Sequence, residues 1–580
     1  ETRFNSTPAP PKVRKPLWRA LMLTVVVAPL NVGLWAFLNR PVHIADWNGE
    51  IGGFAYNASQ RYQDPTRGIF PNEAELASDV RVLSQYTKRL RLYQSTETPQ
   101  VPRLARFYGM SVMGGAWLDK RIEHNERELE GLIALSRKYD NIDRAVVGNE
   151  QILLGNLSPQ QLIGYLDRAR AQLKIPVSTA EPLDTWQRHP ELIRHVDFVT
   201  VHILPYWEFV PRKDAIGWVL GQYRAVRKLV TDQGFPDKPV VIGEVGWPSN
   251  GDRRKAAQPS LADEAHFLRE WFNVAKKENL DYYVMEAIDQ PWKAANEGLA
   301  GAYWGVLDAN RQQKFAFTGT VIEDPSWPWK AGIASLIALL PMFWFARHFI
   351  RFRALGLAFF LALIQVSASI LVWMATLPYD FYLDPLDWGM LVLLFPAQLA
   401  IILILLINGF EFTEVIWRPR WLREFRMLPP DPVEQQPFVS IHLACYNEPP
   451  EMVILTLDSL AALDYENYEV LVIDNNTKKE EVWKPVEAHC AKLGAKFRFY
   501  HLDPWPGFKA GALNFGLKET DPRAEIVAVV DADYEVRRDW LSALTGYFHD
   551  PKVAVVQCPQ AHRDYEHNAF RRMTNWEYDG

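Results

Sequence analysis

The sequence predicts an α/β protein built from a (β/α)8 barrel, a set of transmembrane helices and a doubly wound parallel-sheet domain. Between residues 45 and 320, short apolar runs alternate with amphipathic helical stretches, which is the pattern of a parallel barrel. Four apolar stretches are each long enough to cross a bilayer, which takes about 20 residues. From residue 438 onward, apolar strands end in carboxylates, as in open parallel sheets that bind ligands at their carboxyl ends.

The composition limits the partners and the compartment. A chain of 580 residues predicts two or more domains. Its 63 basic and 69 acidic residues leave a net charge of -6, which gives no electrostatic basis for a nucleic-acid partner. The cysteines, Cys445, Cys490 and Cys558, all lie in the last quarter of the chain. We expect them to be small buried hydrophobes in a reducing compartment, and no disulfide is expected in residues 50–320.

The apolar stretches at residues 17–38, 329–349, 354–377 and 389–410 are predicted transmembrane helices. The first has the position of a signal peptide, but its apolar run is too long. Its exit, Asn39-Arg-Pro-Val42, also lacks a small-residue cleavage site. We therefore interpret it as an uncleaved anchor that follows a cytoplasmic tail, residues 1–16.

Charged residues beside the spans predict one topology. Basic residues cluster before the first span, between the second and third, and after the fourth: Lys12, Arg14, Lys15, Arg19, Arg347, Arg351, Arg353, Arg418, Arg420, Arg423 and Arg426. The loop between the third and fourth spans is acidic, with Asp380, Asp384 and Asp387. By the positive-inside rule, residues 40–326 are outside and residues from 411 onward are cytoplasmic. Residues 411–437 are either an interfacial amphipathic segment or an ordinary linker.

The outer domain, residues 45–320, is predicted to be the (β/α)8 barrel. The expected strands are Ile51–Tyr56, Leu90–Tyr93, Phe107–Met113, Ala145–Asn149, Pro176–Thr179, Phe198–Ile203, Pro239–Gly243 and Tyr282–Ala287. In such a barrel the carboxyl ends of all strands form one catalytic rim.

Two glutamates follow these strands: Glu150 ends the fourth and Glu244 ends the seventh. They are expected to face each other across the barrel mouth. A separation of about 5 Å between their carboxyl groups gives a retaining double displacement on a glycosidic bond. Glu244 would attack the anomeric carbon, and Glu150, protonated in the free protein, would act as acid and then as base. A salt bridge or a solvated loop position is the alternative for either residue alone.

The residues around these glutamates resemble glycoside hydrolase family 17, the β-1,3-glucanase family. The matching motifs are Val147-Gly-Asn149-Glu150, Gly243-Glu244-Val-Gly-Trp-Pro-Ser249, Arg91-Leu-Tyr93, Glu286-Ala-Ile-Asp-Gln-Pro-Trp-Lys293 and Trp304-Gly305. The resemblance implies a barrel, retention, Glu150 as acid/base and Glu244 as nucleophile, with no cofactor. Two departures are His202, where family members often have Asn, and Gln290, in place of a carboxylate of the plant enzymes.

Polar and aromatic side chains near the strand tips are expected to bind the sugar. Asn149, beside the acid, is placed to bond the sugar 2-hydroxyl, and aromatic rings offer faces to the CH groups of glucose. The expected substrate-binding residues are Asn149, Tyr93, His202, Tyr206, Trp207, Trp292, Lys293 and Trp304. Core packing is the alternative for each ring, and pairing with an acid is the alternative for Lys293. Trp117 is a further platform candidate, whereas Trp247 is expected in the core because Gly246 and Pro248 predict a tight turn.

Three apolar strands in residues 438–580 lead to polar residues that suit a nucleotide sugar. The first leads into Tyr446-Asn-Glu448, the second ends at Asp474 and the third ends in Asp531-Ala-Asp533. Because the carboxyl ends of parallel strands meet at one edge, these side chains are expected to converge. Asp-x-Asp suits a divalent cation that bridges diphosphate oxygens, and Lys509 adds positive charge at a helix entry.

This ordered set resembles glycosyltransferase family 2, most closely its processive, cellulose-synthase-like branch. The family implies a GT-A-like fold and UDP-glucose as donor. It implies nucleotide-sugar contacts from Tyr446, Glu448, Asp474, Lys509 and Asp531, and a Mg²⁺ or Mn²⁺ ion held by Asp533 and Asp531. The family's later Thr-Glu-Asp and Gln-x-x-Arg-Trp motifs do not occur before Gly580. Domain 438–580 is therefore expected to be truncated and not to transfer sugar unaided.

Together the parts resemble bacterial proteins of periplasmic, cyclic β-1,3-glucan synthesis. The resemblance implies a multi-pass protein of the bacterial inner membrane with a periplasmic barrel and a cytoplasmic glycosyltransferase domain. Its partners would be a β-glucan, UDP-glucose and the lipid bilayer. The inner domain is expected to polymerise glucose, and the barrel to cut and rejoin the chain. Two alternatives stay open: a membrane-anchored endo-β-1,3-glucanase that only hydrolyses, and a non-catalytic glucan receptor or guide.

Overall fold

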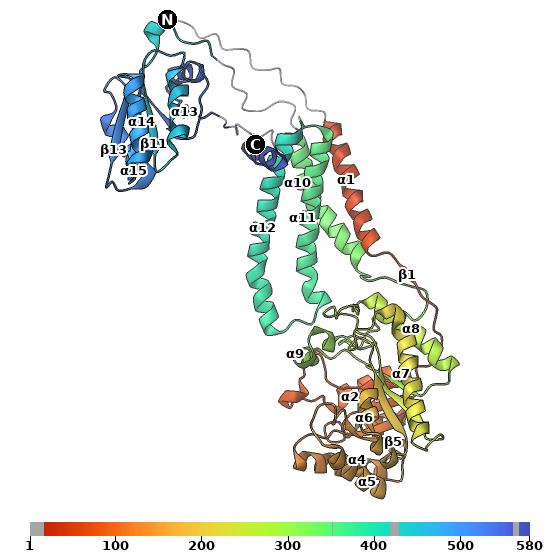
Figure 1. Cartoon of the computed structure of the whole chain (residues 1–580). Helices are drawn as coiled ribbons and strands as arrows, with labels where there is room; N and C mark the ends of the chain where they lie inside the picture. Colours follow the sequence, from red (N-terminus) through yellow and green to blue (C-terminus); the bar gives the residue numbers. More distant parts are fainter. Residues whose placement is uncertain (1–16, 351, 418–427, 559, 561–567, 580) are drawn as a thin grey trace. The chain divides into compact units, whose positions relative to one another are not determined.

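The computed structural model describes residues 17–350, 352–417, 428–558, 560 and 568–579 (Figure 1). The predicted tail 1–16, Arg351 and the arginines between 418 and 426 lie outside the described residues. The chain divides into two compact units, one of residues 1–350 with 354–410, and one of residues 351–353 with 411–580. The first unit holds the barrel and the apolar helices, and the second holds the α/β domain of residues 438–580, called the inner domain after its predicted location.

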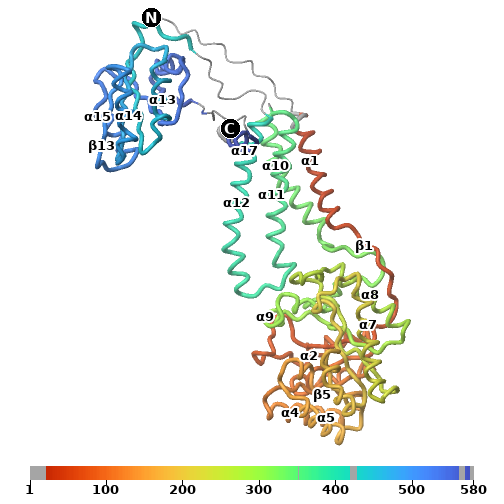
Figure 2. The backbone as a smooth tube through the Cα atoms, in the orientation of Figure 1, coloured from red at the N-terminus to blue at the C-terminus, as the bar shows by residue number. Residues whose placement is uncertain are grey.

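Eight parallel strands form a closed barrel, which confirms the predicted fold (Figures 1 and 2). Neighbouring strands follow chain order, and the last pairs with the first. The strands are β2 (Phe54–Tyr56), β3 (Arg89–Leu92), β4 (Ser111–Ala116), β5 (Ile142–Asn149), β6 (Val177–Pro182), β7 (Val199–Ile203), β8 (Val240–Val245) and β9 (Tyr282–Val284). The helices after them include α2 (Glu73–Leu83), α3 (Val101–Phe107), α4 (Ile122–Lys138), α5 (Pro159–Gln172), α6 (Leu183–Arg188), α7 (Arg212–Asp232), α8 (Leu261–Lys277) and α9 (Ala294–Glu297).

The third strand begins later than the sequence pattern predicts. A strand is expected at Phe107–Met113, but α3 extends to Phe107 and β4 begins at Ser111. Pro102 suits the first turn of α3, where its missing N–H leaves no helix bond unmade. Gly109, with φ +65°, then reverses the chain, and Phe107 stays 83% exposed. A solvent-facing aromatic residue at the end of a short helix therefore resembles a strand residue in the sequence.

Side chains fill the barrel interior and close its amino end. A buried cluster in the barrel consists of Met113, Val146, Ala180, Phe198, Val241 and Tyr283. At the starts of the strands, Asp281 pairs with Arg89 at 2.7 Å and with Arg144 at 2.6 Å. The carboxyl ends of the strands are therefore the end left for chemistry, as in other barrels of this type.

Among the residues that the structure describes, four helices have the length and composition to cross a membrane: α1 (Leu17–Leu38), α10 (Trp327–His348), α11 (Ala354–Asp380) and α12 (Pro385–Trp417). Their most apolar windows have mean hydropathies of 2.1, 1.5, 2.3 and 2.9. α10 packs against α1 and α11. The chain enters the barrel through β1 (Val42–His43) and leaves it through β10 (Thr320–Val321), and these two strands pair antiparallel.

The second unit contains a four-stranded parallel sheet in the order β13-β12-β11-β14, which confirms the predicted parallel α/β class. Its elements are β11 (Val439–Cys445), α13 (Pro450–Ala461), β12 (Tyr468–Asn475), α14 (Glu480–Leu493), β13 (Phe497–Leu502), α15 (Phe508–Glu519), β14 (Ile526–Asp531), α16 (Trp540–Leu544) and α17 (Ala569–Asp579). Every residue of β12 is buried, as in a central strand covered on both faces. Cys445 is in register with Asp474, and Ala444 with Asp531, so the predicted polar residues share one edge.

Candidate active site

Glu150 lies just past β5, where the backbone makes an unusual turn. Gly148 has φ +84° and Glu150 has φ +57°, in the left-handed region that favours glycine. The Glu150 N–H donates to Ala180 O at 2.8 Å, which fixes the turn against β6. The Glu181 carboxylate accepts from Ile152 N at 2.9 Å and so holds the following loop. Local strain of this kind, held by the surrounding structure, is typical of functional sites.

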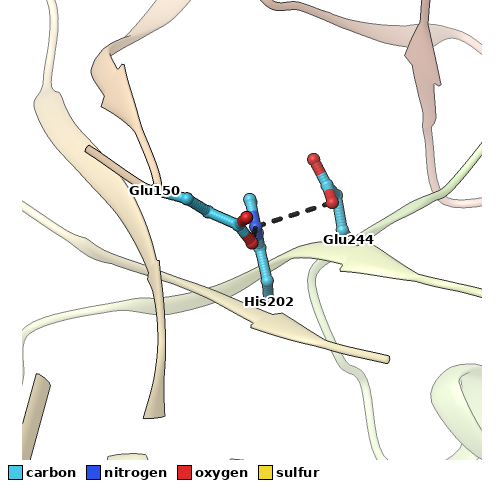
Figure 3. A group of neighbouring side chains, drawn as sticks. All are labelled: Glu150, His202 and Glu244. Atoms are coloured by element: carbon cyan, nitrogen blue, oxygen red, sulfur yellow. Dashed lines mark hydrogen bonds and ion pairs between the residues drawn. The ribbon is translucent and has the colours of Figure 1, made fainter. Parts of the chain in front are cut away.

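His202, in β7, connects the two predicted catalytic carboxylates (Figure 3). Its Nδ1 lies 2.6 Å from Glu150 Oε1, within hydrogen-bond distance, and 3.5 Å from Glu244 Oε2. One nitrogen or carboxylate oxygen from each of the three residues lies within 4.8 Å of the other two. The two glutamates therefore face a common space at the catalytic rim. The position of His202 between them makes it a partner of both carboxylates, in addition to the sugar contact that the sequence predicts.

The same three side chains are of the types that bind a divalent metal ion. The Arg91 guanidinium already contacts Glu244, however, with Nη1 2.8 Å from Oε1. A metal cation at this position would be repelled by that buried positive charge. The donor set therefore suits an ion-paired pair of carboxylates better than a metal centre.

Glu244, in β8, is buried, and a buried arginine holds it. Arg91 Nη1 donates to Glu244 Oε1 and, at 3.0 Å, to Gly243 O, while its Nη2 donates to Asn149 Oδ1. Burial raises the pKa of Glu244, but the charges of His202 and Arg91 lower it by more, so it lies below its ordinary value. Glu244 is therefore ionised at neutral pH, which is the state that a nucleophile needs.

Tyr93 lies beside this pair and lines a hollow at the mouth. The Arg91 guanidinium is 4.9 Å from its ring centroid, and the ring of Trp117 is 6.5 Å away. Burial, and then the charge of Glu244, raise the pKa of Tyr93, so its hydroxyl remains protonated. The hollow is lined by Tyr56, Asn57, Ala58, Ser59, Phe70, Pro71, Leu92, Tyr93, Gln94, Glu97 and Thr98. Tyr93 is therefore placed where a sugar contact is predicted.

Lys293 has a partner other than a sugar. Its Nζ donates to both carboxylate oxygens of Glu286 at 2.9 Å, and both side chains are buried. Burial raises the pKa of Glu286 to about 7, against the opposing charge of Lys293. The alternative that the sequence leaves open, pairing of Lys293 with an acid, is therefore present, and the sugar contact of Lys293 stays a prediction. Its positive charge still acts on Glu244 and helps to lower the pKa of that residue.

The aromatic residues divide into a buried wall and a partly exposed rim. Tyr206 and Trp304 are both 0% exposed, and the Tyr206 hydroxyl donates to Asp252 O at 2.7 Å. Full burial leaves neither ring face open to a sugar, so the expectation that they stack on sugars is corrected. Trp207 stacks on Trp304, with centroids 5.8 Å apart, and is only half-buried. The Arg254 guanidinium also lies 4.3 Å from the centroid of the Trp207 ring, whereas Trp292 is half-buried at the rim.

In the inner domain, the predicted residues lie at the carboxyl edge of the sheet. Asp474 is buried, and it accepts from Thr477 Oγ1 at 2.6 Å and from His501 Nδ1 at 2.7 Å. Lys509 forms an ion pair with Asp531. A charge pair of this kind at the end of β14 combines the acidic and basic groups that a diphosphate and its cation require.

The other predicted residues of this edge are accessible. Tyr446 is 64% exposed, Asp533 is exposed and Glu448 is half-buried. Accessible side chains around a buried, hydrogen-bonded Asp474 suit a site that a ligand completes. The sequence predictions thus describe one edge of the sheet rather than scattered positions.

Sequence reasoning missed the roles of three buried charged residues around the glutamates. Arg91, which the sequence singles out only within a motif, bonds Glu244 and Asn149. Glu286 pairs with Lys293, and Glu181, whose pKa burial raises to about 7, holds the loop after Glu150. The available signal was a charged residue inside an apolar strand, as in Arg89-Leu-Arg-Leu92.

Two family models match the chain. Residues 53–305 match the BtgE/BtgC glycoside hydrolase domain, and residues 440–579 match glycosyl transferase family 2. The probable glucan endo-1,3-beta-glucosidase btgC of Aspergillus flavus is 28% identical over 276 residues, which is 42% of this chain and 40% of that protein. The glucan endo-1,3-beta-glucosidase btgC of Emericella nidulans is 27% identical over 282 residues, 42% of each chain. This chain thus spans well under half the length of these curated relatives.

Solved structures are similar to part of the chain. The glycoside hydrolase family 17 beta-1,3-glucanosyltransferase of Rhizomucor miehei is 26% identical, with a TM-score of 0.40, over 45% of this chain and 95% of that one. An endo-laminarinase from Formosa is 22% identical, with a TM-score of 0.40, over 44% of this chain and 83% of that one.

Proposed function

We propose that this chain, an enzyme with a BtgE/BtgC-type glycoside hydrolase domain and a glycosyltransferase family 2 domain, makes and remodels β-1,3-glucan at a membrane. The observation that carries the proposal is the joint placement of Glu150 and Glu244 on one rim of the barrel, with His202 between them. The relatives of the barrel are named as glucan endo-1,3-beta-glucosidases, which supports a β-1,3-glucan substrate.

The barrel reaction is proposed to be a retaining double displacement. One oxygen of each carboxylate lies within 4.8 Å of one oxygen of the other, which suits the spacing of about 5–5.5 Å in retaining enzymes better than the roughly 6.5–9.5 Å in inverting ones. Glu244, ionised and oriented by Arg91, attacks the anomeric carbon and forms a glycosyl-enzyme. Glu150 gives its proton to the leaving oxygen and then takes one from the incoming acceptor.

Transfer to a second glucan, rather than to water, is the proposed outcome of the second step. A double displacement permits either acceptor, because water and a sugar hydroxyl attack the same intermediate. The half-buried ring of Trp292 at the rim supplies apolar surface that favours a sugar over water. A membrane-anchored hydrolase and a non-catalytic glucan guide are the competing functions.

The inner domain is proposed to use UDP-glucose. Asp531 and Asp533 would hold Mg²⁺ or Mn²⁺, and the bound ion would neutralise charge on the diphosphate. The donor set fits such an ion, since carboxylate oxygens at the end of a parallel strand are hard ligands and Asp533 is exposed. Tyr446, Glu448 and Asp474 would contact the nucleotide, and Lys509, now paired with Asp531, would face the diphosphate.

The protein is proposed to lie in the bacterial inner membrane with its barrel in the periplasm. The support is the four apolar helices and the basic clusters on one side of them.

Incubation of the full chain in detergent with laminari-oligosaccharides tests the proposed function. Products longer than the substrate indicate transfer, and only shorter products indicate hydrolysis. Glu244→Gln is expected to abolish both, since the amide cannot form the glycosyl-enzyme. Undiminished product formation by this variant would remove Glu244 as nucleophile, and an inactive parent that still binds the oligosaccharide would favour the guide.

A further inference from the structure

The chain passes between the apolar helices and the barrel at two places that lie side by side. α1 leads into β1, and β10 leads into α10. The two strands form a small ribbon in which Val42 pairs with Val321 and His43 pairs with Thr320. Two connections joined in one ribbon act as a single hinge, because a domain can still swing about it.

A third connection comes from the loop between α11 and α12. The Tyr382 hydroxyl donates to Asp289 Oδ2 at 2.9 Å and accepts from Ala309 N at 2.9 Å. Its backbone N–H donates to Tyr303 OH at 2.9 Å, and the two tyrosine rings stack with centroids 4.9 Å apart. The Arg61 guanidinium lies 5.4 Å from the Tyr382 ring. Both the hydroxyl and the backbone N–H of Tyr382 are therefore bonded to the barrel.

The barrel side of this contact is rigid. Asp289 is 1% exposed, and its Oδ1 accepts from Lys314 Nζ at 3.0 Å and from Gly305 N at 2.7 Å. Lys314 Nζ is also 3.1 Å from Glu264 Oε2. Burial, and then the charge of Asp289, raise the pKa of Tyr382, so the hydroxyl remains a donor. The loop therefore ends in a buried network of charges rather than on a mobile surface.

The helix side of the loop is fixed as well. Lys330 Nζ, in α10, lies 2.8 Å from Asp380 Oδ2 at the end of α11, and 2.9 Å from Asp324 Oδ2. The Asp324 N–H donates to Asn39 Oδ1 at 3.2 Å, directly after α1. One network therefore connects the ends of three helices, and Tyr382 follows Asp380 by two residues.

These attachments lie at the catalytic end of the barrel. Asp289 follows the carboxyl end of β9. Glu323, just past β10, accepts from Leu261 N at 3.0 Å, at the first residue of α8. The helices of a (β/α)8 barrel begin at the catalytic rim, so the ribbon and the Tyr382 contact are at the same end as Glu150 and Glu244.

We propose that the loop Phe381–Asp384 is a strap that holds the catalytic mouth of the barrel toward the membrane, so that the mouth takes glucan arriving from that side. The ribbon of β1 and β10 forms the hinge, and Tyr382 prevents the swing. The identity of the ligand rests on the proposed function, whereas the strap rests on its contacts alone. A large polymer in bulk solution then has hindered access, and a short oligosaccharide does not.

Tyr382→Ala in the full chain, in lipid nanodiscs, tests the strap. Tyr379→Ala is the matched control, because Tyr379 lies three residues earlier and is 85% exposed. Amide hydrogen exchange in residues 286–309 is expected to rise about tenfold in Tyr382→Ala, as for the loss of one hydrogen bond to a charged group. The control, and helices α4 and α5 in both variants, are expected to keep the parent rates. Unchanged exchange in residues 286–309 would overturn the strap.

If exchange in Tyr382→Ala rises throughout the barrel, the same exchange measurement is made on Tyr382→Phe. This variant keeps the ring and loses only the hydroxyl. A second measurement tests whether the mouth faces the membrane. It is the ratio of kcat/KM for laminarin to kcat/KM for laminaripentaose. Tyr382→Ala is expected to raise this ratio several-fold, whereas simple destabilisation lowers both values and keeps the ratio. If hydrogen exchange becomes faster but the kcat/KM ratio does not change, the proposal that the mouth faces the membrane is overturned. A parent chain inactive on both substrates would contradict the proposed function, while hydrogen exchange still decides the strap.

Discussion

Arg91 and Glu244 form a buried ion pair at the catalytic rim, with Nη1 2.8 Å from Oε1 and side chains 1% and 6% exposed. The pair joins β3 to β8 and so crosses the barrel mouth. Because the same guanidinium also bonds Asn149, it aligns the predicted nucleophile with the residue beside the predicted acid.

Arg91→Met is expected to leave Glu244 buried without its strongest hydrogen-bond partner. The free energy of unfolding should fall by about 3–5 kcal/mol, the range for breaking a buried ion pair. The lost charge also raises the pKa of Glu244, so the acid limb of kcat/KM should move to higher pH. Chemical denaturation and a pH–rate profile measure the two effects. Arg91→Lys keeps the positive charge but not the planar, bidentate guanidinium group. Its acid limb of kcat/KM should therefore shift less than that of Arg91→Met.

Glu150→Ala is expected to slow turnover of laminari-oligosaccharides by about 10²–10⁴-fold, the usual contribution of general acid–base catalysis. An aryl β-laminaribioside with a good leaving group needs no acid in the first step, so its glycosyl-enzyme should accumulate. Added azide should restore turnover and give the β-glycosyl azide. Glu244→Ala should instead give the α-glycosyl azide, since azide then replaces the nucleophile. The same anomer from both variants would contradict the assigned roles.

His202→Asn is expected to retain most activity and to change its pH dependence. The charge of His202 lowers the pKa of Glu244, so its removal raises that pKa and moves the acid limb of kcat/KM upward. Asn keeps a donor that can reach Glu150, whereas His202→Ala does not and should lose more in kcat. Profiles of kcat/KM for the two variants over pH 4–8 give the comparison. Superimposable acid limbs in parent and His202→Asn would show that His202 does not act on Glu244.

Glu181→Gln is expected to alter how stability depends on pH. Burial raises the pKa of Glu181 to about 7, above its unfolded value, so its contribution is full below the unfolded pKa. That contribution is lost as pH rises toward 7, by up to about 3 kcal/mol. The parent should therefore lose stability relative to Glu181→Gln between about pH 4.5 and pH 7. Unfolding midpoints of both proteins across this range measure the difference, and parallel curves would refute the assignment.

Asp533→Asn is expected to weaken metal-dependent UDP binding by the inner domain. Loss of one carboxylate ligand lowers affinity for a hard divalent cation, and with it affinity for the diphosphate that the cation bridges. Titration calorimetry of the full chain with UDP, with and without Mn²⁺, separates the metal-dependent part. Asp539→Asn, six residues further on beside Arg537, is the control substitution. Equal weakening by both variants would indicate a general effect of charge.

Much of the barrel could be predicted because its signals are local. Glu150 and Glu244 each follow an apolar run that reads as a strand on its own, and parallel strands place their carboxyl ends on one rim. The third strand was misplaced because Phe107 is apolar yet points to solvent from the end of α3. The predicted end of a helix or strand depends on single residues of this kind, whereas the predicted order of the helices and strands does not.

The details of the site depend on packing that a sequence does not display. Tyr206 and Trp304 follow strand tips as sugar platforms do, but the chain folds them into the wall behind Trp207. Lys293 has the chemistry of a sugar ligand, and only proximity assigns it to Glu286. The contact of Tyr382 with Asp289 joins residues 93 apart in the chain and has no local signal.

The ribbon of Val42 with Val321 also bears on how such a protein can be assembled and altered. Entry and exit of the outer module are neighbours, and domains with adjacent ends tolerate insertion and excision. Replacing residues 44–319 by a tight turn would leave α1 and α10 running in the same directions as before. A catalytic module of this kind can therefore be grafted onto, or cut from, a set of apolar helices as a single unit.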